Sequence, residues 1–254
     1  MEERFVQTAA TERPISGAEQ PPGSPGPAHL ADPRALMILT TEHWSLLTAR
    51  SLVYNEAFAR TGMFLTFLTG TLVALGFVSQ GSGYGPEFLL VATALLGFDL
   101  FIGLTTLGRI TAAGNEEFQA LQGMNRLRHA YLEMVPGLEP YFSTSPHDDL
   151  MGVLAIYGAT PERPSLLGNL AHGLTTAPGM VATICAVVGG GFAASLALLI
   201  GATTTLAIVA GLVAFTFLFV GLWVAAIRAF QGIGRRIEVR FPTPPPTAGG
   251  GPSR

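Results

Sequence analysis

The sequence predicts an all-α integral membrane protein, with four transmembrane helices in two hairpins and amphipathic helical extensions on the cytoplasmic side. Three observations lead to this fold class. The chain of 254 residues is 49% hydrophobic and 12% charged, about half the charge of an ordinary soluble domain. Four windows are long and apolar enough to cross a bilayer. Every Arg lies outside these windows and outside the short connector that joins the two windows of each hairpin.

Each apolar window contains about 20 residues, the length of helix that crosses a hydrocarbon core of about 30 Å. Lipid offers no hydrogen-bond partner, so the backbone groups must pair within each segment, which predicts helices. Four buried helices of a soluble bundle are the alternative, but such helices usually keep a polar stripe. The windows are residues 62–79, 88–108, 179–200 and 206–227, and together they contain one charged residue, Asp99.

The distribution of Arg predicts the orientation. All 14 basic residues are Arg, and none lies in the connectors 80–87 and 201–205. Because cytoplasmic segments carry the excess of positive charge, both termini and residues 109–178 are expected in the cytoplasm. The Arg, Gly and Pro content is typical of a GC-rich bacterial genome, so we expect the bacterial inner membrane. Residues 1–35 lack the apolar region of a secretory signal.

The N-terminal region should contain a tail and an amphipathic helix. Residues 1–35 are Pro-rich and show no periodicity, which is typical of disorder. A helix should begin near Thr40 or Thr41, either of which can cap it. No proline follows until Pro86, so this helix can continue into the first span as one helix over 41–79. Its apolar stripe consists of Trp44, Leu47, Tyr54 and Phe58.

The second span can also extend into the cytoplasm, because no proline occurs before Pro136. Three glycines at 108, 114 and 123 argue against an unbroken helix. A new short helix is expected from Ser145-Pro146 to Gly158, and a further segment over 165–174 leads to the third span. The apolar stripe of the extension consists of Phe118, Leu121, Met124, Leu127, Tyr131 and Met134.

The third and fourth spans should form a tight antiparallel hairpin, because few residues join them. Small residues recur at every fourth position and would let helix backbones approach closely, within one hairpin or between protomers. After the fourth span, residues 228–241 resemble a basic helical extension that could contact anionic lipid headgroups. The candidate packing residues are Ala186, Gly190, Ala194, Ala207 and Gly211, and the candidate headgroup residues are Arg235, Arg236 and Arg240.

These features divide the chain into seven regions. The hairpins are separated by a cytoplasmic helical segment and flanked by extensions and tails. The divisions are a disordered Pro-rich tail (1–35), an amphipathic cytoplasmic helix (36–61), the first hairpin (62–108), a cytoplasmic helical segment (109–178), the second hairpin (179–227), a basic extension (228–241) and a disordered Pro/Gly-rich tail (242–254).

Asp99 is the most informative single residue. An ionised carboxylate in the middle of a span costs about 2.5–3.5 kcal/mol on insertion scales, so this residue has to face a helix interface or water, or be protonated. It could be an ion or proton site, or line a polar pore. It could instead make an interhelical hydrogen bond to another subunit or to one of three threonines. These threonines are Thr66, Thr69 and Thr71.

His147, Asp148 and Asp149 could suggest a metal or a general acid–base group. The more economical interpretation is that Ser145-Pro146 starts a helix whose dipole the two carboxylates complement. A metal would need further ligands, and Cys185 is the only cysteine. No nucleotide-binding or hydrolase motif occurs. We therefore expect no catalytic residue, no cofactor, no metal and no nucleic acid partner.

Four stretches, 41–52, 64–75, 122–133 and 138–149, resemble an uncharacterised group of bacterial four-span membrane proteins. The resemblance covers about residues 40–230 and implies no activity. More distantly, an amphipathic cytoplasmic helix that feeds a hairpin is similar to SLATT-type domains. That similarity implies an oligomeric membrane effector, although those domains are usually two-span modules and this chain has four expected spans.

The sequence therefore favours a non-enzymatic, homo-oligomeric inner-membrane protein that acts as a scaffold or a pore-type effector in contact with the lipid bilayer. A small ion or proton channel or transporter that uses Asp99 is the first alternative. A membrane-bound enzyme with a cluster of His147, Asp148 and Asp149 is the lesser one.

Overall fold

The computed structural model describes residues 30–156, 173–236 and 238–244. Over these residues the protein is helical and contains no strand. Four helices are long and apolar enough to cross a membrane: α1 (Pro33–Ser82), α2 (Pro86–Met134), α5 (Ala177–Leu199) and α6 (Thr204–Arg236). The prediction of an all-α chain with four candidate spans is thereby confirmed.

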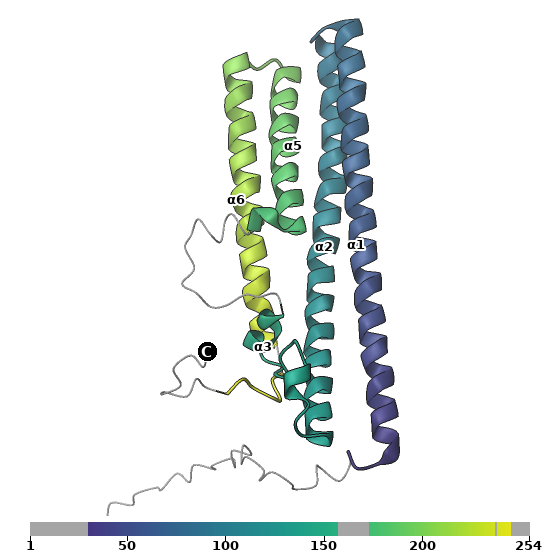
Figure 1. The fold of residues 1–254 in the computed structure, drawn as a ribbon. Helices are drawn as coiled ribbons and strands as arrows, with labels where there is room; N and C mark the ends of the chain where they lie inside the picture. Colours follow the sequence, from purple (N-terminus) through teal and green to yellow (C-terminus); the bar gives the residue numbers. More distant parts are fainter. Residues whose placement is uncertain (1–29, 157–172, 237, 245–254) are drawn as a thin grey trace, which may run out of the picture.

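The four long helices pack in the order α1, α2, α5 and α6 (Figure 1). Helix α1 lies along α2 over the length of both, α5 packs on the upper half of α2, and α6 packs on α5. Gly83 and Gly201, which follow α1 and α5, have φ angles of 63° and 89°. Glycine adopts these angles without a Cβ clash, so both connections can be tight turns.

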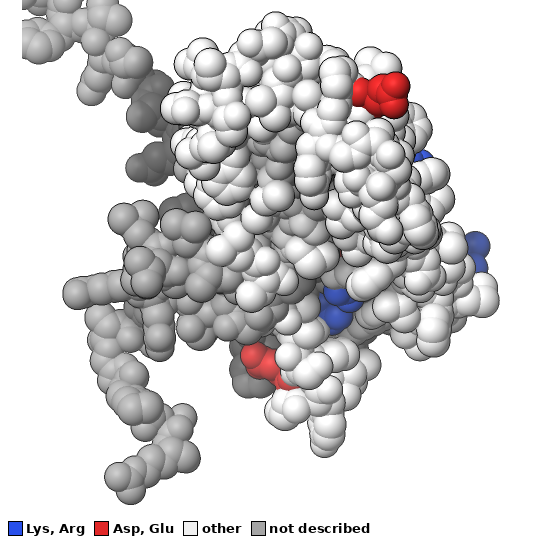
Figure 2. Space-filling view, turned by 90° about the horizontal axis from the view of Figure 1, so that it is seen from above, with Lys and Arg blue, Asp and Glu red and all other residues white. Residues whose placement is uncertain are grey.

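The end of the molecule that holds these two turns is poor in charge. Seen from this end, uncharged residues cover almost all of the visible surface of the described residues (Figure 2). The sequence of the turns agrees with this view, because the connector 80–87 contains one acidic residue and no basic one, and 201–205 contains neither.

Helix α1 begins seven residues before the predicted start at Thr40. Asp32 caps it, since its carboxylate accepts a hydrogen bond of 2.8 Å from the backbone N–H of Arg34, and Pro33 occupies the first helical position. An acidic cap followed by proline is a strong start signal. The hydroxyls of Thr40 and Thr41 instead donate to carbonyls four residues earlier, inside the helix. The predicted tail is therefore too long by three residues, and residues 1–29 lie outside the described part.

Helix α2 is unbroken over 49 residues, so the break that three glycines suggested is absent. No neighbour lies within 4 Å of a Cβ placed on Gly108 or Gly114, whereas one on Gly123 would come within 2.9 Å of Leu46 Cδ1 on α1. Gly123 therefore lets α1 approach α2. The packing between the two helices offsets the cost of glycine in a helix interior, which is about 1 kcal/mol per residue relative to alanine.

Two apolar clusters hold the helices together. The upper one joins α1, α2 and α5 around Phe64, Ile110, Val181 and Cys185. The lower one is built on the predicted stripe of α2 and consists of Phe118, Leu121, Met124 and Val153, with Leu46 of α1 packed against it.

The predicted stripe of α1 does not take part in this packing. Trp44, Leu47, Tyr54 and Phe58 are all exposed, and α1 packs on α2 with a different side.

The short helix α3 (Leu150–Ala155) starts later than predicted. Asp149 is its cap and accepts a hydrogen bond of 2.8 Å from the N–H of Gly152. The Ser145 hydroxyl instead accepts a hydrogen bond from the N–H of His147, which forms a turn before the helix. The predicted end at Gly158 and most of the predicted segment 165–174 lie outside the described residues.

Helix α6 continues past the fourth window to Arg236, as the basic extension predicted. Residues 238–244, called the C-terminal segment below, are not helical and run back against α2 and the loop before α3 (Figure 1). The prediction of helix over 238–241 is wrong, because the backbone N–H groups of residues 240 and 241 bond to the Asp148 carboxylate. Residues 245–254 of the predicted tail lie outside the described part.

Candidate functional site

Asp99 lies on the side of α2 that faces its helix neighbours, and its residue surface is 1% exposed. Its level follows from contacts on either side of it along α2. A Cβ on Gly97 would meet Phe192 of α5, and one on Gly103 would meet both Cys185 of α5 and Phe64 of α1. Asp99 is therefore enclosed within a single chain at the depth where α1 and α5 flank α2.

Neither carboxylate oxygen of Asp99 has a hydrogen-bond partner among the described residues. The proposed bond to a threonine of α1 is not formed. The hydroxyls of Thr66 and Thr69 donate to the carbonyls of Gly62 and Leu65 in their own helix, and no bond joins Thr71 to Asp99. Asp99 thus differs from an ordinary structural carboxylate, which is paired when it is buried.

Burial of a carboxylate without a partner is costly, because the group loses its hydration and gains no hydrogen bond in return. Chemically, this group can take up a proton, or bind a cation whose remaining ligands are backbone carbonyls or water. Mutagenesis data give about 1–3 kcal/mol for a buried polar group left unsatisfied. Such a residue in a candidate span is a functional-site hypothesis.

The small residues of α5 and α6 lie where these helices make their closest approach. A Cβ placed on Gly190 would come within 2.9 Å of the carbonyl oxygen of Gly211, and one on Gly211 would come within 3.1 Å of Ala194 Cβ. Ala186 and Ala207 are buried as well. Packing within one chain therefore accounts for Gly190, Ala194 and Gly211.

An ion-pair cluster joins α1 and α2 directly below the first two windows. The Arg109 guanidinium donates to Glu56 on α1 at 2.7 Å and to Glu116 at 2.6 Å, and Arg60 donates to Glu56 at 3.0 Å. Hydrogen bonds from Arg109 and Arg60 lower the pKa of Glu56 to about 2. Further down α1, Arg50 pairs with Glu117 of α2 at 2.9 Å. Sequence reasoning missed this cluster, because it depends on the antiparallel register of the two helices.

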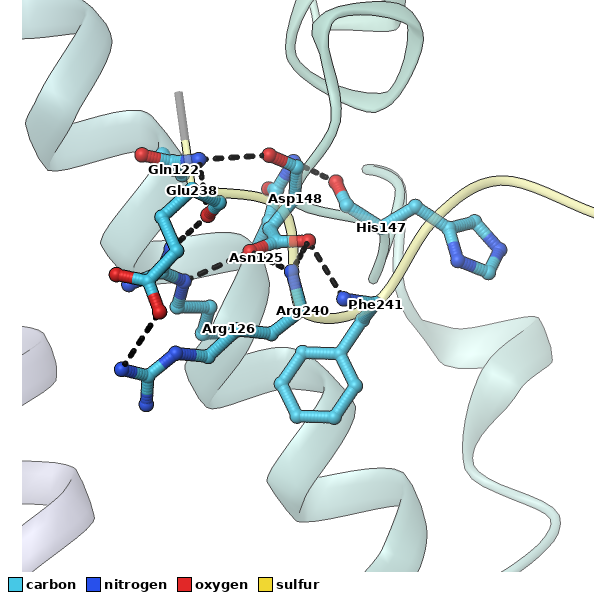
Figure 3. Close-up of polar contacts among 8 residues, drawn as sticks. All are labelled: Gln122, Asn125, Arg126, His147, Asp148, Glu238, Arg240 and Phe241. Atoms are coloured by element: carbon cyan, nitrogen blue, oxygen red, sulfur yellow. Dashed lines mark hydrogen bonds and ion pairs between the residues drawn. The ribbon is translucent and has the colours of Figure 1, made fainter. Parts of the chain in front are cut away.

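A second polar cluster surrounds Asp148, whose side chain is fully buried (Figure 3). Its carboxylate accepts hydrogen bonds from Arg126 Nε at 2.7 Å and from the backbone N–H groups of Phe241 at 2.7 Å and Arg240 at 3.1 Å. Its backbone carbonyl accepts from Gln122 at 3.0 Å. Burial acts to raise the pKa of Asp148, but these hydrogen bonds outweigh it and hold the pKa below its ordinary value.

Neighbouring contacts extend this cluster. Asn125 donates to the carbonyl of His147 at 2.7 Å, and the rings of His129 and Phe241 stack with centroids 3.9 Å apart. Thr243 donates to Asp149 from its backbone N–H and its hydroxyl. The cluster therefore ties the C-terminal segment to α2 and to the start of α3.

The structure gives structural roles to two of the three polar residues at 147–149. Asp148 and Asp149 hold chain segments together, and the Nδ1 atom of His147 is buried without a hydrogen-bond partner among the described residues. Over the same residues no group of three or more His, Cys, Asp or Glu side chains could hold a metal ion. Sequence reasoning missed Arg126 and Phe241, since nothing local indicates that these residues meet Asp148.

The candidate headgroup residues remain a prediction. Arg235 and Arg236 lie in the last turn of α6, and their side chains are outside the described part. Arg240 is exposed, and its guanidinium contacts Glu238 at 3.4 Å. The Asp148 cluster that holds its backbone includes Arg126, which lies about 27 Å along α2 from the end of the second window. Comparison with known proteins adds no further residue: the chain matches no protein-family model, no curated protein and no solved structure.

Proposed function

We propose that this chain is a non-enzymatic, multi-pass protein of the bacterial inner membrane that assembles with copies of itself and acts as a scaffold. Its four long helices cross the bilayer in two hairpins. The lower parts of α1 and α2 (residues 33–60 and 109–134) form a rigid cytoplasmic stalk. The continuity of these two helices through both regions is the observation that carries the proposal.

The lengths support a stalk. Helix α1 has 50 residues and α2 has 49, so each is about 75 Å long, more than twice the hydrocarbon thickness of about 30 Å. About 40 Å of each helix is left outside the core. The Arg109–Glu56 pair and the lower apolar cluster, with Leu121 at its centre, join the two helices along this part. Because the helices are continuous, a movement of the membrane part would also move the stalk, and copies that assemble in the membrane would bring their stalks together.

The polar groups of the cytoplasmic part also favour a structural role. The carboxylates of Asp148 and Asp149 are the best candidates for acid–base chemistry. They accept hydrogen bonds from Arg126, Phe241 and Thr243 instead. The orientation rests on the positive-inside rule, with all 14 Arg residues on the stalk side of the windows. The resemblance to SLATT-type domains points to the same class of oligomeric membrane protein.

The test is a mass measurement of the full chain in mild detergent and in lipid nanodiscs. We expect a defined multiple of the 26.6 kDa chain. A monomer at every concentration in both media contradicts the proposal. Leakage of small dyes from vesicles that contain the protein then separates a scaffold from a pore, because a scaffold leaves the vesicles sealed.

Asp99 favours a second candidate, a small proton or cation channel or transporter. The supporting observation is that both of its buried oxygens lack a partner in the described part of the chain. In this case Asp99→Asn abolishes proton or cation flux into liposomes and leaves the assembled mass unchanged. Equal flux through both proteins contradicts a role of Asp99 in transport.

A further inference from the structure

Helix α1 carries a second apolar stripe below the membrane. Met37, Trp44, Leu47, Tyr54 and Phe58, together with the small polar residues Thr40 and Ser51, follow one another at alternating steps of three and four residues. This is the heptad pattern of a helix that packs against another helix. We call these seven positions the outer stripe.

The outer stripe is not the side of α1 that contacts α2. The side that faces α2 has its own series with the same steps, from Leu39 through Leu46 and Val53, and these side chains are partly buried. At about 100° per residue the two series are displaced by roughly a third of a turn. The α1 sequence therefore provides for two helix partners, and the chain itself supplies one of them.

The exposure of the outer stripe is large. Met37 is 66% exposed, Trp44 64% and Phe58 72%, and none of these is inside a predicted window. An aromatic side chain has a surface of about 150–250 Å², so the three aromatic residues of the stripe, Trp44, Tyr54 and Phe58, together expose on the order of 350 Å². An open apolar groove of about 400 Å³ runs beside the stripe, between Trp44 and Tyr131 of α2. This exposed apolar area is within the range of the largest patches on soluble monomers, and such patches are often functional.

Lipid accounts for Phe58, which lies about 6 Å along α1 from the first window and so at headgroup depth, but not for the lower part of this surface. Met37 lies 24 residues before Thr61, so it is about 36 Å along α1 from the start of the first window. The headgroup layer adds only about 5–7 Å to the hydrocarbon core on each side. The two terminal parts outside the described residues are poor covers as well: residues 1–29 hold four large apolar side chains among five prolines, and residues 245–254 hold none.

The stripe is compatible with a copy of itself. Copies in one membrane have the same orientation, so their α1 helices would run parallel and in register. The flanking positions on one side are Thr41, Thr48 and Asn55, and Arg50 is the only charged residue on the other. Arg50 would oppose a neutral residue, and it already pairs with Glu117 of its own chain. No like charges would meet, which removes the usual barrier to self-association.

We infer that the outer stripe of α1 is the contact between copies of this chain, with the α1 helices parallel and in register around the assembly axis. The inference rests on the proposed assembly and specifies its surface. Thr40 and Ser51 then face the same residues of the neighbouring copy.

Single cysteines in a Cys185→Ala background test this arrangement in native membranes. Ser51→Cys lies on the outer stripe, and Ala49→Cys is the matched control, because residue 49 is also exposed but lies on the opposite side of α1. Under mild oxidation we expect at least tenfold more disulfide-linked dimer with Ser51→Cys than with Ala49→Cys. Equal yields overturn the inference, including the case where Ser51→Cys is shielded from maleimide without forming a dimer.

A charge at the same two positions gives a second measurement. Ser51→Arg places like charges against each other and should shift the mass in nanodiscs to the monomer, whereas Ala49→Arg should leave it unchanged. A full-size assembly with Ser51→Arg overturns the inference. An oligomeric wild type with negative results at residue 51 refutes the outer stripe and leaves the proposed assembly standing, whereas a monomeric wild type contradicts both.

Discussion

Replacing Asp148 with Ala should release the C-terminal segment from the stalk. The carboxylate is fully buried and accepts hydrogen bonds from Arg126, Arg240 and Phe241. Removal of one partner of a buried ion pair costs about 3–5 kcal/mol. The Arg126 side chain is 29% exposed and keeps its hydrogen bond to the carbonyl of Glu238, so we expect the lower end, about 3 kcal/mol.

Amide hydrogen exchange of the protein in nanodiscs measures this effect directly. A loss of about 3 kcal/mol increases the open population of the segment roughly 150-fold, because each 1.4 kcal/mol is a factor of ten. The amides of Arg240 and Phe241 should exchange faster by about that factor. Ser145→Ala is the control, since it removes a hydrogen bond from the N–H of His147, worth about 1 kcal/mol, and leaves the bonds of Asp148 and Asp149 to the C-terminal segment in place. Unchanged exchange at residues 240 and 241 in Asp148→Ala refutes the reasoning.

The same contact predicts a pH dependence. The pKa of Asp148 is below its ordinary value in the folded protein, so its contribution to stability is complete above the unfolded-state pKa of about 4. As the pH falls through the lower folded-state pKa, the carboxylate becomes protonated and the contribution is lost. In wild type, protection of the amides at 240 and 241 should fall as the pH drops below about 4. Asp148→Ala should show a smaller acid transition, with the remainder due to Asp149, whose burial acts to raise its pKa but is outweighed by hydrogen bonds from Thr243 and Gly152, which hold the pKa below its ordinary value. An identical acid transition in the variant refutes the assignment.

Three further predictions concern the helices. Gly190→Ala should destabilise the protein by about 1–3 kcal/mol in thermal unfolding, because the new Cβ meets a backbone oxygen. Gly191→Ala should be neutral or stabilising, because its new Cβ meets only the end of a Leu side chain at 3.5 Å. Equal effects of the two substitutions contradict the close approach of α5 and α6. The pKa of Glu56 is lowered to about 2, so its pair with Arg109 contributes to stability above about pH 4.5, and this contribution is lost towards pH 2. The melting temperatures of wild type and Glu56→Gln should therefore converge in acid. A difference that stays constant with pH contradicts this prediction. Asp99→Val should raise the free energy of unfolding by about 1–3 kcal/mol, because it removes an unpaired buried carboxylate, and a destabilised variant would point to a partner in the assembly.

The four long helices could be predicted because their signal is local. A window of about 20 apolar residues has few alternatives to a helix, and Asp99 was found because it is the only charge among the windows. The start of α1 was also present locally in Asp32-Pro33, and reliance on the later threonines missed it. In α2 the glycine penalty was weighed without the contact between Gly123 and Leu46, which exists only once α1 is in place.

The sites that were missed depend on residues far apart in the chain. Asp148 and Phe241 are 93 residues apart, and the pattern around 145–149 is equally typical of a helix start. The small residues of α5 and α6 predicted close packing but left open which helices meet, until the Gly190–Gly211 approach placed that contact within one chain. The apolar stripe at Trp44 was recognised from its spacing, but periodicity alone does not show whether a stripe is covered within the chain.

The position of the C-terminal segment has a consequence for synthesis. A chain emerges N-terminal end first, so α1 and α2 are complete while Phe241 has not yet been added. Until then Asp148 has Arg126 as its only partner among the groups that bond to its carboxylate in the finished protein. The hydrogen bonds from the C-terminal segment to Asp148 can therefore form only after all four long helices have been translated, so their formation marks the completion of α6.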